Sequence, residues 1–576
     1  MTAATQDSTL GPEYRERAWK ALGEAPFDVL VIGGGVTGAG VALDAATRGL
    51  RTAVVEQRDW ASGTSSRSSK LFHGGLRYLE QLNFSLVREA LKERELMLTR
   101  ICPHLVKPVS FLYPLNHRIW ERPYMAAGLT MYDTMGGARS VPGFKSLTRR
   151  GALRLAPGLK PDAFVGAMRY YDAQADDARH TLAVVRTAAH YGAVVRNSTE
   201  VVALLHEGDR IVGATVRDVE TGQTTDIRAT VVINCTGVWT DDMQHLAGGR
   251  GRFRVRASKG VHIVVPRDRF ASETGLILRT EKSVLFFIPW GTRWIIGTTD
   301  TDWSLDRAHP AATRADIDYI LEHANTVLRT PLTRDDVRGV YAGLRPLLAG
   351  ESEGTSSLSR EHAVARPQPG LVSIAGGKYT TYRVMAADAV DAAKADLGSH
   401  VPPSVTEHVP LLGADGYHAL VNQVPSLARR YRVPEHRVLH LLNRYGSETL
   451  ELLDLGRETP DLLEPLEGAE DYLRVEILYA ATHEGALHLD DLLARRTRMS
   501  IEYGHRGVGS AQAVADLVAP VLGWDAERIA EEVRSYTERV AAERASQELP
   551  DDEAADAARR EAPDSRPLVS ASKPRP

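Results

Sequence analysis

The stretch FDVLVIGGGVTGAGVALDAATRGL, residues 27–50, constrains the fold of this chain more than any other feature. Residues 27–32 form a continuous apolar run of strand length, which is typical of a parallel strand buried on both faces. Helical spacing of apolar residues follows, and residues 51–56 return to an apolar run. Strand, glycine turn, helix and strand together predict a βαβ unit in a parallel sheet.

Three glycines of the turn, Gly33, Gly35 and Gly38, have the spacing of a dinucleotide-binding motif. In that motif the first glycine permits a tight turn, the second lets backbone approach a pyrophosphate, and the third lets helix and strand pack closely. Glu56 ends the next strand, where a carboxylate can bind ribose hydroxyls and disfavours a 2′-phosphate. The glycine spacing alone is weak evidence, but with Glu56 it predicts a dinucleotide site rather than the turn of another α/β fold.

Length, charge and cysteine usage exclude several classes of protein. A chain of 576 residues is too long for one core, so we expect two or three folding units. The net charge of -4 argues against a general nucleic-acid-binding protein. Only Cys102 and Cys235 occur, which predicts neither disulfides nor a metal site and suits a reducing cytoplasm. We expect no signal peptide, and no run reaches the roughly 18 apolar residues of a membrane-spanning helix.

Beyond the first βαβ unit the chain reads as an interrupted α/β region followed by helices. Alternating strands around residues 261–266, 283–290 and 293–300 predict an antiparallel layer inserted into the parallel-sheet region. SVLFFIPW and RWIIGTTD, joined by Gly-Thr, predict a hairpin within that layer. Segments after about residue 400 are amphipathic and helical, and the residues from 548 onward lack an apolar face, which predicts disorder.

The segment TSSRSSKLFHGGLRYLE, residues 64–80, favours FAD over NAD as the dinucleotide. An NAD dehydrogenase normally continues in regular βα units after the acidic residue, whereas hydroxyls and backbone donors follow here. Glycine turns in NCTG, at Gly237, and in AGGKYTT, at Gly377, offer further contacts far along the chain. A long cofactor that is contacted at several points fits FAD.

Six segments in a fixed order carry a resemblance to a known family. GGGVTGAG, TSSRSSKLFHGGLRYLE, KGVHIVVP, IIGTTD, AGLRP and AGGKYTTYR together resemble FAD-dependent glycerol-3-phosphate dehydrogenases over about residues 26–400. The resemblance implies oxidation of sn-glycerol 3-phosphate to dihydroxyacetone phosphate by hydride transfer to FAD, with electrons passed to a membrane quinone. The helical region resembles the family's C-terminal domain more weakly, and the tail has no counterpart. Arg67 and Tyr379 depart from the family's usual residues.

The predicted fold class is α/β, with a Rossmann-like FAD-binding parallel sheet, an inserted antiparallel substrate layer (the cap) and a C-terminal all-α domain. We divide the chain into an N-terminal extension with a short helix (1–25), an oxidoreductase domain (26–400), a helical domain (401–547) and a disordered tail (548–576). Within the oxidoreductase domain, the FAD-binding parts are about 26–103, 165–252 and 340–400, and the cap is about 104–164 and 253–339.

Binding of a phosphate dianion requires fixed cations, of which arginine is the preferred kind. The family's motifs imply substrate binding by Arg77, Arg345 and Lys378, with Tyr78 beside the first of them. A single arginine is more often a surface charge or part of an ion pair, whereas three cations in the matching motifs favour a pocket for a dianion.

Oxidation of the C2 alcohol requires a group that takes the hydroxyl proton or a cation that holds the oxygen. His262, on an alternating strand, is the first candidate for the base, and the alternative for it is a structural histidine. His73 is the second candidate, although packing against the cofactor explains it better. With His262, the predicted catalytic set contains Arg345 and Lys378.

Reduced flavin carries negative charge, which suits the N-terminus of the helix after AGGKYTT, with threonine as its cap. The glycine pair in FHGG is expected to let backbone approach the flavin ring. The predicted FAD-binding residues lie in the glycine turn, the strand end, the hydroxyl-rich loop, a later strand and two further glycine turns: Gly33, Gly35, Gly38, Glu56, Ser65, Ser66, Ser69, Lys70, His73, Gly75, Val201, Gly237, Lys378, Thr380 and Thr381.

Residues 118–135 carry aromatic residues and methionines beside arginines. Such segments can lie in a bilayer interface, although a stripe of this kind is more often core. With the resemblance, this segment predicts a cytoplasmic protein that is peripheral on the inner face of the cell membrane. The helical domain offers a surface for a homodimer.

Three alternatives to this function stay open. The nearest is a glycerol-3-phosphate oxidase that passes electrons to O2, because nothing in the sequence decides the acceptor. An FAD-dependent amine or amino-acid oxidase would need a carboxylate clamp rather than a pocket for a dianion. A flavin-binding scaffold protein without turnover would lack the cationic residues.

Overall fold

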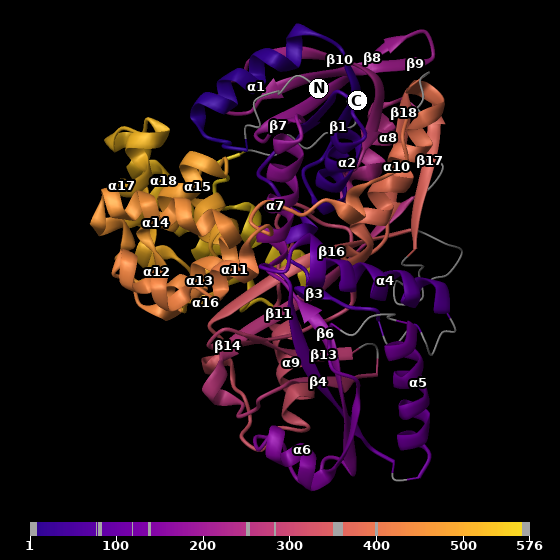
Figure 1. The fold of residues 1–576 in the computed structure, drawn as a ribbon, viewed down its shortest axis with the longest axis vertical. Helices are drawn as coiled ribbons and strands as arrows, with labels where there is room; N and C mark the ends of the chain where they lie inside the picture. The colour runs from indigo at the N-terminus through magenta and orange to yellow at the C-terminus, as the bar shows by residue number, and fades with distance from the viewer. Residues whose placement is uncertain are drawn as a thin grey trace.

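The computed structural model describes most of the chain as two large sheets with a helical region beside them (Figure 1). One sheet occupies the upper half of the view, the other the lower half, and the C-terminal helices lie to the left. The predicted α/β fold with an inserted antiparallel layer and C-terminal helices is confirmed. The described residues are 8–75, 78, 83–117, 119–135, 140–248, 254–281, 284–348, 361–397 and 401–566.

The upper sheet contains the predicted parallel strands. It consists of β1 (Phe27–Ile32), β2 (Thr52–Val55), β7 (Val194–Arg196), β8 (Thr199–Glu207), β9 (Arg210–Asp218), β10 (Thr224–Asn234), β17 (His362–Gln368) and β18 (Leu371–Gly376). β1 pairs in parallel with β2 and β10, and β7 and β18 continue the parallel order outward. β8, β9 and β17 are antiparallel additions at its margins.

Both faces of β1 are buried, which explains its uninterrupted apolar run. Val29 and Val31 face a core that they share with the helices α2 (Val36–Thr47), α7 (Asp177–His190) and α10 (Tyr382–Leu397). Leu30 and Ile32 face a second core, to which α1 (Pro12–Glu24) contributes Leu22. The short helix expected before the first strand therefore covers one face of the sheet.

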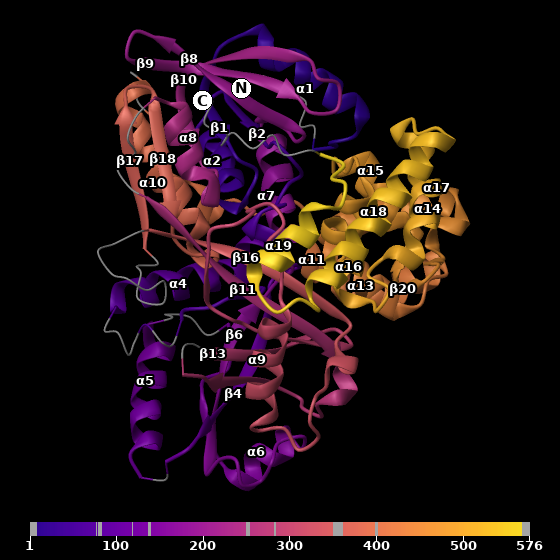
Figure 2. The ribbon, with the colours of Figure 1, turned by 180° about the vertical axis from the view of Figure 1, so that it is seen from behind.

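The lower sheet is the predicted inserted layer, whose strands pair antiparallel except for β4 and β12, which run parallel (Figure 2). It consists of β3 (Leu71–Phe72), β4 (Lys107–Leu115), β5 (Lys145–Thr148), β6 (Gly166–Gln174), β11 (Val255–Pro266), β12 (Gly275–Arg279), β13 (Val284–Trp290), β14 (Arg293–Gly297), β15 (Thr301–Trp303) and β16 (Gly339–Leu348). β11 pairs antiparallel with β14, β15 and β16. β13 and β14 form the predicted hairpin, with Gly291 at φ +54° in its two-residue turn.

The predicted cap boundaries at residues 165 and 340 differ from the pairing of the strands. β6 and β16 follow these boundaries and were expected in the FAD-binding part, yet both pair within the lower sheet. β6 ends at Gln174 and α7 begins at Asp177, so the chain passes from one sheet to the helices of the other without a long linker. A boundary of this kind leaves no glycine- or proline-rich signal in the sequence.

Residues 118–135 divide between core and surface. In α5 (Glu121–Met135), the side chains of Met125, Leu129 and Tyr132 are buried, as the core interpretation of the stripe predicts. Beside them, Trp120 and Tyr124 are 55% and 50% exposed. α5 lies at the periphery of the molecule in Figures 1 and 2.

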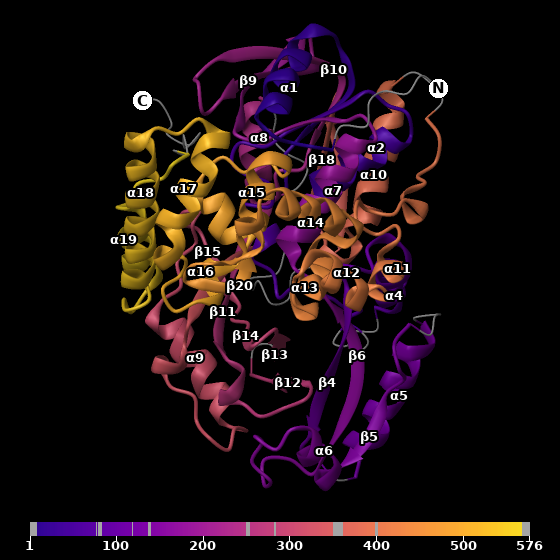
Figure 3. The same ribbon diagram turned by 60° about the vertical axis from the view of Figure 1, so that its left-hand side comes forward.

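The C-terminal helices form the predicted separate region, with two apolar cores of its own (Figure 3). A two-stranded ribbon of β19 (Pro465–Leu466) and β20 (Ala469–Leu473) makes the region helical but not all-α. The helices are α11 (Tyr417–Val421), α12 (Val424–Tyr431), α13 (Glu435–Tyr445), α14 (Thr449–Glu458), α15 (Arg474–His483), α16 (Met499–Glu502), α17 (Ala511–Leu522) and α18 (Ala526–Ser546).

The prediction of a disordered tail is wrong for residues 548–566. Residues 552–560 form a helix, α19 (Asp552–Arg560), whose N-cap Asp551 accepts a hydrogen bond from the Ala554 N–H at 2.9 Å. Figure 3 shows α19 beside α18. Composition concealed this segment because ion pairs hold it: the Arg566 guanidinium, 3% exposed, binds Asp491. Residues 567–576 lie outside the described residues.

Within the described ranges, no helix combines the length and the apolar character that crossing a bilayer requires.

Candidate functional site

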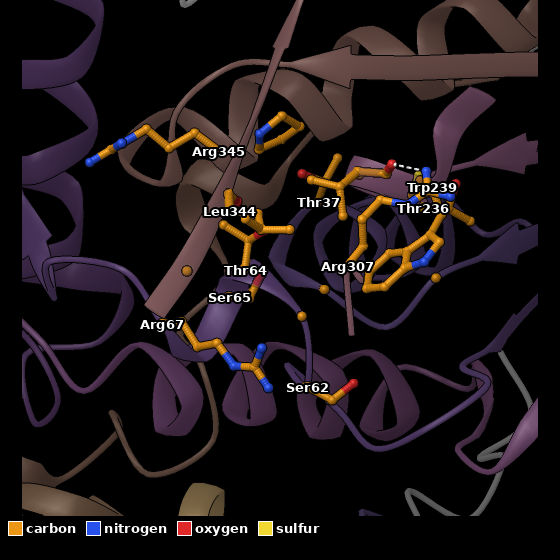
Figure 4. A pocket seen from close by; sticks show the side chains of 18 of the residues that line it. Thr37, Ser62, Thr64, Ser65, Arg67, Thr236, Trp239, Arg307, Leu344 and Arg345 are labelled. Atoms are coloured by element: carbon orange, nitrogen blue, oxygen red, sulfur yellow. Dashed lines mark hydrogen bonds between the residues drawn. The ribbon is translucent and has the colours of Figure 1, made fainter. Parts of the chain in front are cut away.

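A cavity of about 1590 Å³ is lined by both sheets and by the C-terminal segment. One wall contains the carboxyl ends of β1, β2 and β10, which is where open parallel sheets bind ligands. The opposite wall contains β11 and β16 of the lower sheet. Figure 4 shows side chains around this space, among them Thr37, Thr236 and, on β16, Arg345.

The glycine turn has the geometry that its motif predicts. Gly33 has φ +112°, and a Cβ there would lie 2.7 Å from the Cys235 carbonyl oxygen. A Cβ at Gly38 would lie 1.9 Å from the Gly33 carbonyl oxygen. Gly33 and Gly35 line the cavity, whereas Gly38 lies behind them in α2 and permits the close packing of helix and strand.

Glu56 is fixed at the end of β2 by two backbone hydrogen bonds. Its Oε2 accepts from the Gly34 N–H at 2.7 Å, and its Oε1 accepts from the Arg58 N–H at 2.8 Å. Burial raises the pKa of Glu56, while these N–H groups act in the opposite direction. The carboxylate lines the cavity beside the glycine turn, where the motif expects it to bind hydroxyls.

The hydroxyl-rich loop contributes part of what was predicted. Ser65 and Ser69 line the cavity, and the Ser65 Oγ accepts from the Val36 N–H at 2.9 Å at the start of α2. Ser66 and Lys70 do not line it. The Lys70 ammonium is buried and binds Asp177 Oδ1 at 2.8 Å, so its charge is engaged by Asp177 rather than directed into the cavity.

The glycine pair that follows this loop makes room for side chains rather than lining the cavity. Gly75 has φ +77°, and a Cβ there would lie 2.3 Å from the Tyr78 ring. A Cβ at Gly74 would lie 2.7 Å from Leu91. The contact with Tyr78 accounts for glycine at position 75, and Gly75 does not line the cavity, whereas His73 and Tyr78 do. Arg77 lies outside the described residues.

The register of two strands brings His262 and Arg345 to one face of the lower sheet. Ser258 pairs with Arg345, Gly260 with Gly343 and His262 with Tyr341. Alternate residues of a strand share a face, so these six residues lie on one face of the sheet, and four of them, Gly260, His262, Gly343 and Arg345, line the cavity. A Cβ at Gly260 would lie 2.6 Å from Arg345 Nη2, which shows that the absent side chain leaves space for the guanidinium.

His262 is a buried, neutral histidine. Its Nε2 lies 2.9 Å from Ser69 Oγ, and its ring stacks on Tyr341 with centroids 4.8 Å apart. Burial lowers the pKa of His262 well below its ordinary value, and the positive charges of Arg345 and Lys70 act in the same direction. The imidazole lines the cavity, and its lowered pKa leaves it neutral at neutral pH.

Arg345 is held on several sides while its guanidinium lines the cavity. It donates to Thr298 Oγ1 at 3.1 Å and to Ser258 Oγ at 3.3 Å, and it lies 3.4 Å from Asp300 Oδ1. Thr298 and Asp300 belong to the IIGTTD motif, and Ser258 directly precedes KGVHIVVP. With Arg345 in AGLRP, three of the predicted motifs meet at this guanidinium.

Lys378, which follows β18 of the upper sheet, is another cation that lines the cavity. Its Nζ lies 3.4 Å from the centre of the Tyr78 ring, a cation–π contact between two predicted substrate-binding residues. Thr380 lines the cavity, but its Oγ1 accepts from the His73 N–H at 3.2 Å rather than capping a helix. Thr381 is buried and does not line the cavity.

The two remaining predicted contacts, Val201 and Gly237, both line the cavity. Sequence reasoning missed a further set of lining side chains, and Figure 4 shows several of them on different sides of the space. They include Thr37, Ser62, Thr64, Arg67, Thr236, Trp239, Arg307 and Leu344.

Arg67 was noticed in the sequence only as a departure from the family's usual residue. Its Nη1 donates to the Ala308 carbonyl oxygen at 2.8 Å. Burial and the nearby guanidinium of Arg559 lower the pKa of Arg67 to about 9. Tyr379, the other departure, donates from its hydroxyl to the Asp177 carbonyl oxygen at 2.7 Å.

The donor set suits an extended, anionic dinucleotide rather than a metal. The glycine turn leaves a space that a Cβ would fill, and this space lies at the N-terminus of α2. Cationic side chains line other parts of the cavity. Among the described residues, no three His, Cys, Asp or Glu side chains gather in a way that could hold a metal ion.

Two family descriptions match the chain. "FAD dependent oxidoreductase" matches residues 28–383, and "C-terminal domain of alpha-glycerophosphate oxidase" matches residues 404–529. Together they cover the two sheets and most of the helical region, and the second ends before α19.

Curated proteins similar to this chain share one printed name. Glycerol-3-phosphate dehydrogenase of Mycobacterium leprae is 66% identical over 562 residues, which is 98% of this chain and 96% of the relative. Glycerol-3-phosphate dehydrogenase 2 of Mycobacterium bovis is 64% identical over 97% of this chain and 96% of its own length. The human mitochondrial glycerol-3-phosphate dehydrogenase is 37% identical over 87% of this chain and 71% of its own length.

Among solved structures, glycerol-3-phosphate dehydrogenase of Bacillus halodurans complexed with FAD matches with a TM-score of 0.77 and 29% identity. The match covers 92% of this chain and 98% of that structure.

Proposed function

The chain belongs to the FAD-dependent glycerol-3-phosphate dehydrogenase family, and on that premise we propose that it oxidises sn-glycerol 3-phosphate to dihydroxyacetone phosphate. It is an enzyme that uses FAD. The observation that carries the proposed substrate is the meeting of a neutral, buried histidine, His262, with the cations Arg345 and Lys378 in one cavity.

The glycine turn, Glu56, Ser65 and Gly237 would hold FAD, because they form the cradle at the ends of the parallel strands. The N–H groups at the start of α2 suit its diphosphate. FAD supplies, when bound, a two-electron acceptor for the hydride that leaves C2 of the substrate.

The cationic side chains and His262 would bind and activate the substrate. Arg345 and Lys378 offer fixed positive charge to the phosphate dianion or to the C2 oxygen as it becomes negative. Arg77 completes the proposed cationic set by the family's motif. His262, which is neutral and lines the cavity, takes the hydroxyl proton at a ring nitrogen. Because burial makes this imidazole a weak base, the cations that hold the C2 oxygen share in promoting loss of the proton.

Anaerobic reduction tests the substrate. Glycerol 3-phosphate added to the purified holoenzyme without oxygen is expected to bleach the flavin absorbance, whereas glycerol and an amino acid are not. A flavin that only the amino acid bleaches would contradict the proposal and favour an amino-acid oxidase. Readmission of air then separates an oxidase, which reoxidises rapidly with formation of hydrogen peroxide, from a dehydrogenase.

We propose a membrane quinone as the electron acceptor. We also propose that the protein contacts the membrane through the exposed side of α5 and the two residues that precede this helix. Ile119, Trp120, Tyr124 and Met131 are exposed to 87, 55, 50 and 39%. Arg122 of α5 donates to Ser146 Oγ at 2.5 Å, which brings the exposed basic residues of the neighbouring segment close to this side. Those residues are Lys145, Arg149 and Arg150. An apolar and aromatic surface flanked by basic residues suits the headgroup region of an anionic bilayer.

Sedimentation with anionic phosphatidylglycerol vesicles tests this surface. The wild-type protein is expected to sediment with the vesicles, and Trp120→Glu is expected to weaken the partition about tenfold or more, since it adds a charge where an aromatic ring enters the interface. Leu439→Glu changes an exposed apolar residue on the helical region and is the matched control. Equal loss in both variants would contradict a contact through α5.

A further inference from the structure

The C-terminal segment forms part of the wall of the cofactor cavity. We call residues 552–566 the strap, which runs from the start of α19 to Arg566. Figure 2 shows α19 beside β16, the strand that carries Arg345. The family descriptions that match the chain end at residue 529, so neither describes the strap. Five strap residues line the cavity: Asp556, Arg559, Arg560, Ala562 and Asp564.

The first half of the strap is anchored to the lower sheet. Asp552 pairs with the Lys259 ammonium of β11, which also binds Asp316 at 2.7 Å. Ala555 is fully buried in an apolar cluster with Trp303 and with Leu344, the residue before Arg345. This anchoring fixes α19 against the wall on which the proposed substrate-binding cation lies.

The second half is clamped beside the glycine turn. Asp564 accepts from Arg58 Nη1 at 2.7 Å and from Arg58 Nη2 at 3.0 Å, and its Oδ2 lies 2.8 Å from His309 Nε2. The backbone N–H of Arg58 is one of the two donors that fix Glu56. The bidentate geometry therefore joins the strap to the residue next to the proposed ribose-binding carboxylate.

Arg566 closes the strap at its end. Its guanidinium is 3% exposed and binds both carboxylate oxygens of Asp491 at 2.6 and 2.9 Å, and its Nε donates to Ser198. Asp491 belongs to the helical region, and Ser198 lies between β7 and β8 of the upper sheet. Loss of one partner of such a buried pair leaves an uncompensated charge, which makes this end a strong point of attachment.

We propose that the strap is an integral part of the FAD site and retains the cofactor. Release of FAD requires the Asp564–Arg58 and Arg566–Asp491 pairs to open first, because the strap spans the cavity wall between them. Arg559 adds positive charge next to Arg67 in a wall that faces an anionic dinucleotide. The proposal rests on FAD occupying this cavity.

The release rate of FAD tests the proposal. Flavin fluorescence is followed after dilution of the holoenzyme, for the wild type, Asp564→Asn, Arg566→Gln and a protein that ends at residue 550. Release is expected to be about tenfold faster or more in each variant, which is the effect of one lost charge-assisted hydrogen bond. Glu553→Gln changes an exposed side chain of the same helix and is expected to release FAD at the wild-type rate. Unchanged release in both single substitutions would overturn the proposal, and so would an equal acceleration in the control.

A second measurement separates retention of FAD from general stabilisation. At a given concentration, a ligand raises the melting temperature more when it binds more tightly, so the strap variants are expected to show a smaller rise on addition of FAD. Variants whose apoprotein and holoenzyme melt lower by the same amount would overturn the proposal. If the shortened protein does not fold, the two single substitutions decide. Neither measurement uses substrate: a wild-type protein that holds FAD but is not reduced by glycerol 3-phosphate would contradict the proposed substrate and leave the strap standing.

Discussion

The two sides of the cavity are built in different ways. At the cradle, residues 33–56 form a contiguous stretch whose backbone fixes the geometry through positive φ and close contacts. At the opposite wall, His262 and Arg345 come from strands far apart in the chain, and side chains carry the chemistry. The first side depends on the absence of side chains and the second on their charge and protonation, so substitutions at the two sides should fail differently.

The largest effect is expected at His262. His262→Gln keeps a polar side chain of similar size near Ser69 but removes the base, and the turnover number is expected to fall about 100- to 10,000-fold. Flavin content, measured by the ratio of absorbance at the flavin band to that of the protein, should stay at the wild-type level. A variant that lost its FAD instead would break the distinction between the two sides.

Arg345 should show the next largest effect. Arg345→Met leaves Asp300, which has a side chain 3% exposed, without its cation in a buried site, and kcat/KM for glycerol 3-phosphate is expected to fall about 100- to 1,000-fold. Steady-state kinetics under FAD saturation measures this change. Arg345→Lys keeps the charge but not the fork of donors and should recover only part of the loss. Full recovery would contradict a role for the guanidinium geometry.

At the cradle, Gly38→Ala should lower the affinity for FAD more than it lowers the turnover number of the FAD-saturated enzyme. The added Cβ would lie 1.9 Å from the Gly33 carbonyl oxygen, so helix and strand must separate, and FAD affinity is expected to fall about 10- to 100-fold. Titration of the apoprotein with FAD measures this loss. Gly128→Ala is the matched control, because that helical glycine has nothing within 4 Å of an added Cβ and its replacement should stabilise α5 slightly.

The same contrast explains what could be predicted from the sequence. That Gly33, Gly35 and Glu56 lie together at the cavity could be predicted from the sequence, because they are close in the chain and are positioned by local backbone geometry. His262 and Arg345 were found through the family's motifs, and only the strand register shows why Gly260 and Gly343 lie between them. Physical periodicity alone would not have paired these two strands.

The differences between prediction and structure come from partners that are distant in sequence. Lys70 was assigned to the cofactor, but its ammonium binds Asp177 at the start of α7, which no local pattern indicates. The strap was taken as disordered because its few apolar residues cannot form a core, yet Asp564 and Arg566 are held by buried ions from other domains. Composition predicts disorder correctly only where no such partners exist.

The smallest expected effect separates the proposed catalytic histidine from purely structural ones. His104 and His180 are buried outside the cavity lining, and burial lowers the pKa of each to about 3. The unfolded chain, with an ordinary pKa near about 6.5, therefore binds more protons than the folded protein between about pH 3 and 6.5, so stability rises with pH in that window and is lost as pH falls through it. Each histidine should lower the free energy of unfolding by about 1.4 kcal/mol per pH unit below about 6.5.

Chemical denaturation of the wild type and of His104→Gln between pH 7.5 and 5.5 measures this slope. As pH falls, the free energy of unfolding of the variant should decrease less steeply than that of the wild type, because the variant takes up about one proton fewer on unfolding. Its turnover number at neutral pH should stay at the wild-type level. His262 shares the lowered pKa for the same reason of burial, so a pKa shift alone does not identify a base. What distinguishes His262 is its position on the face with Arg345. A His104→Gln variant with a wild-type pH slope, or with lost turnover, would contradict this division between structural and catalytic histidines.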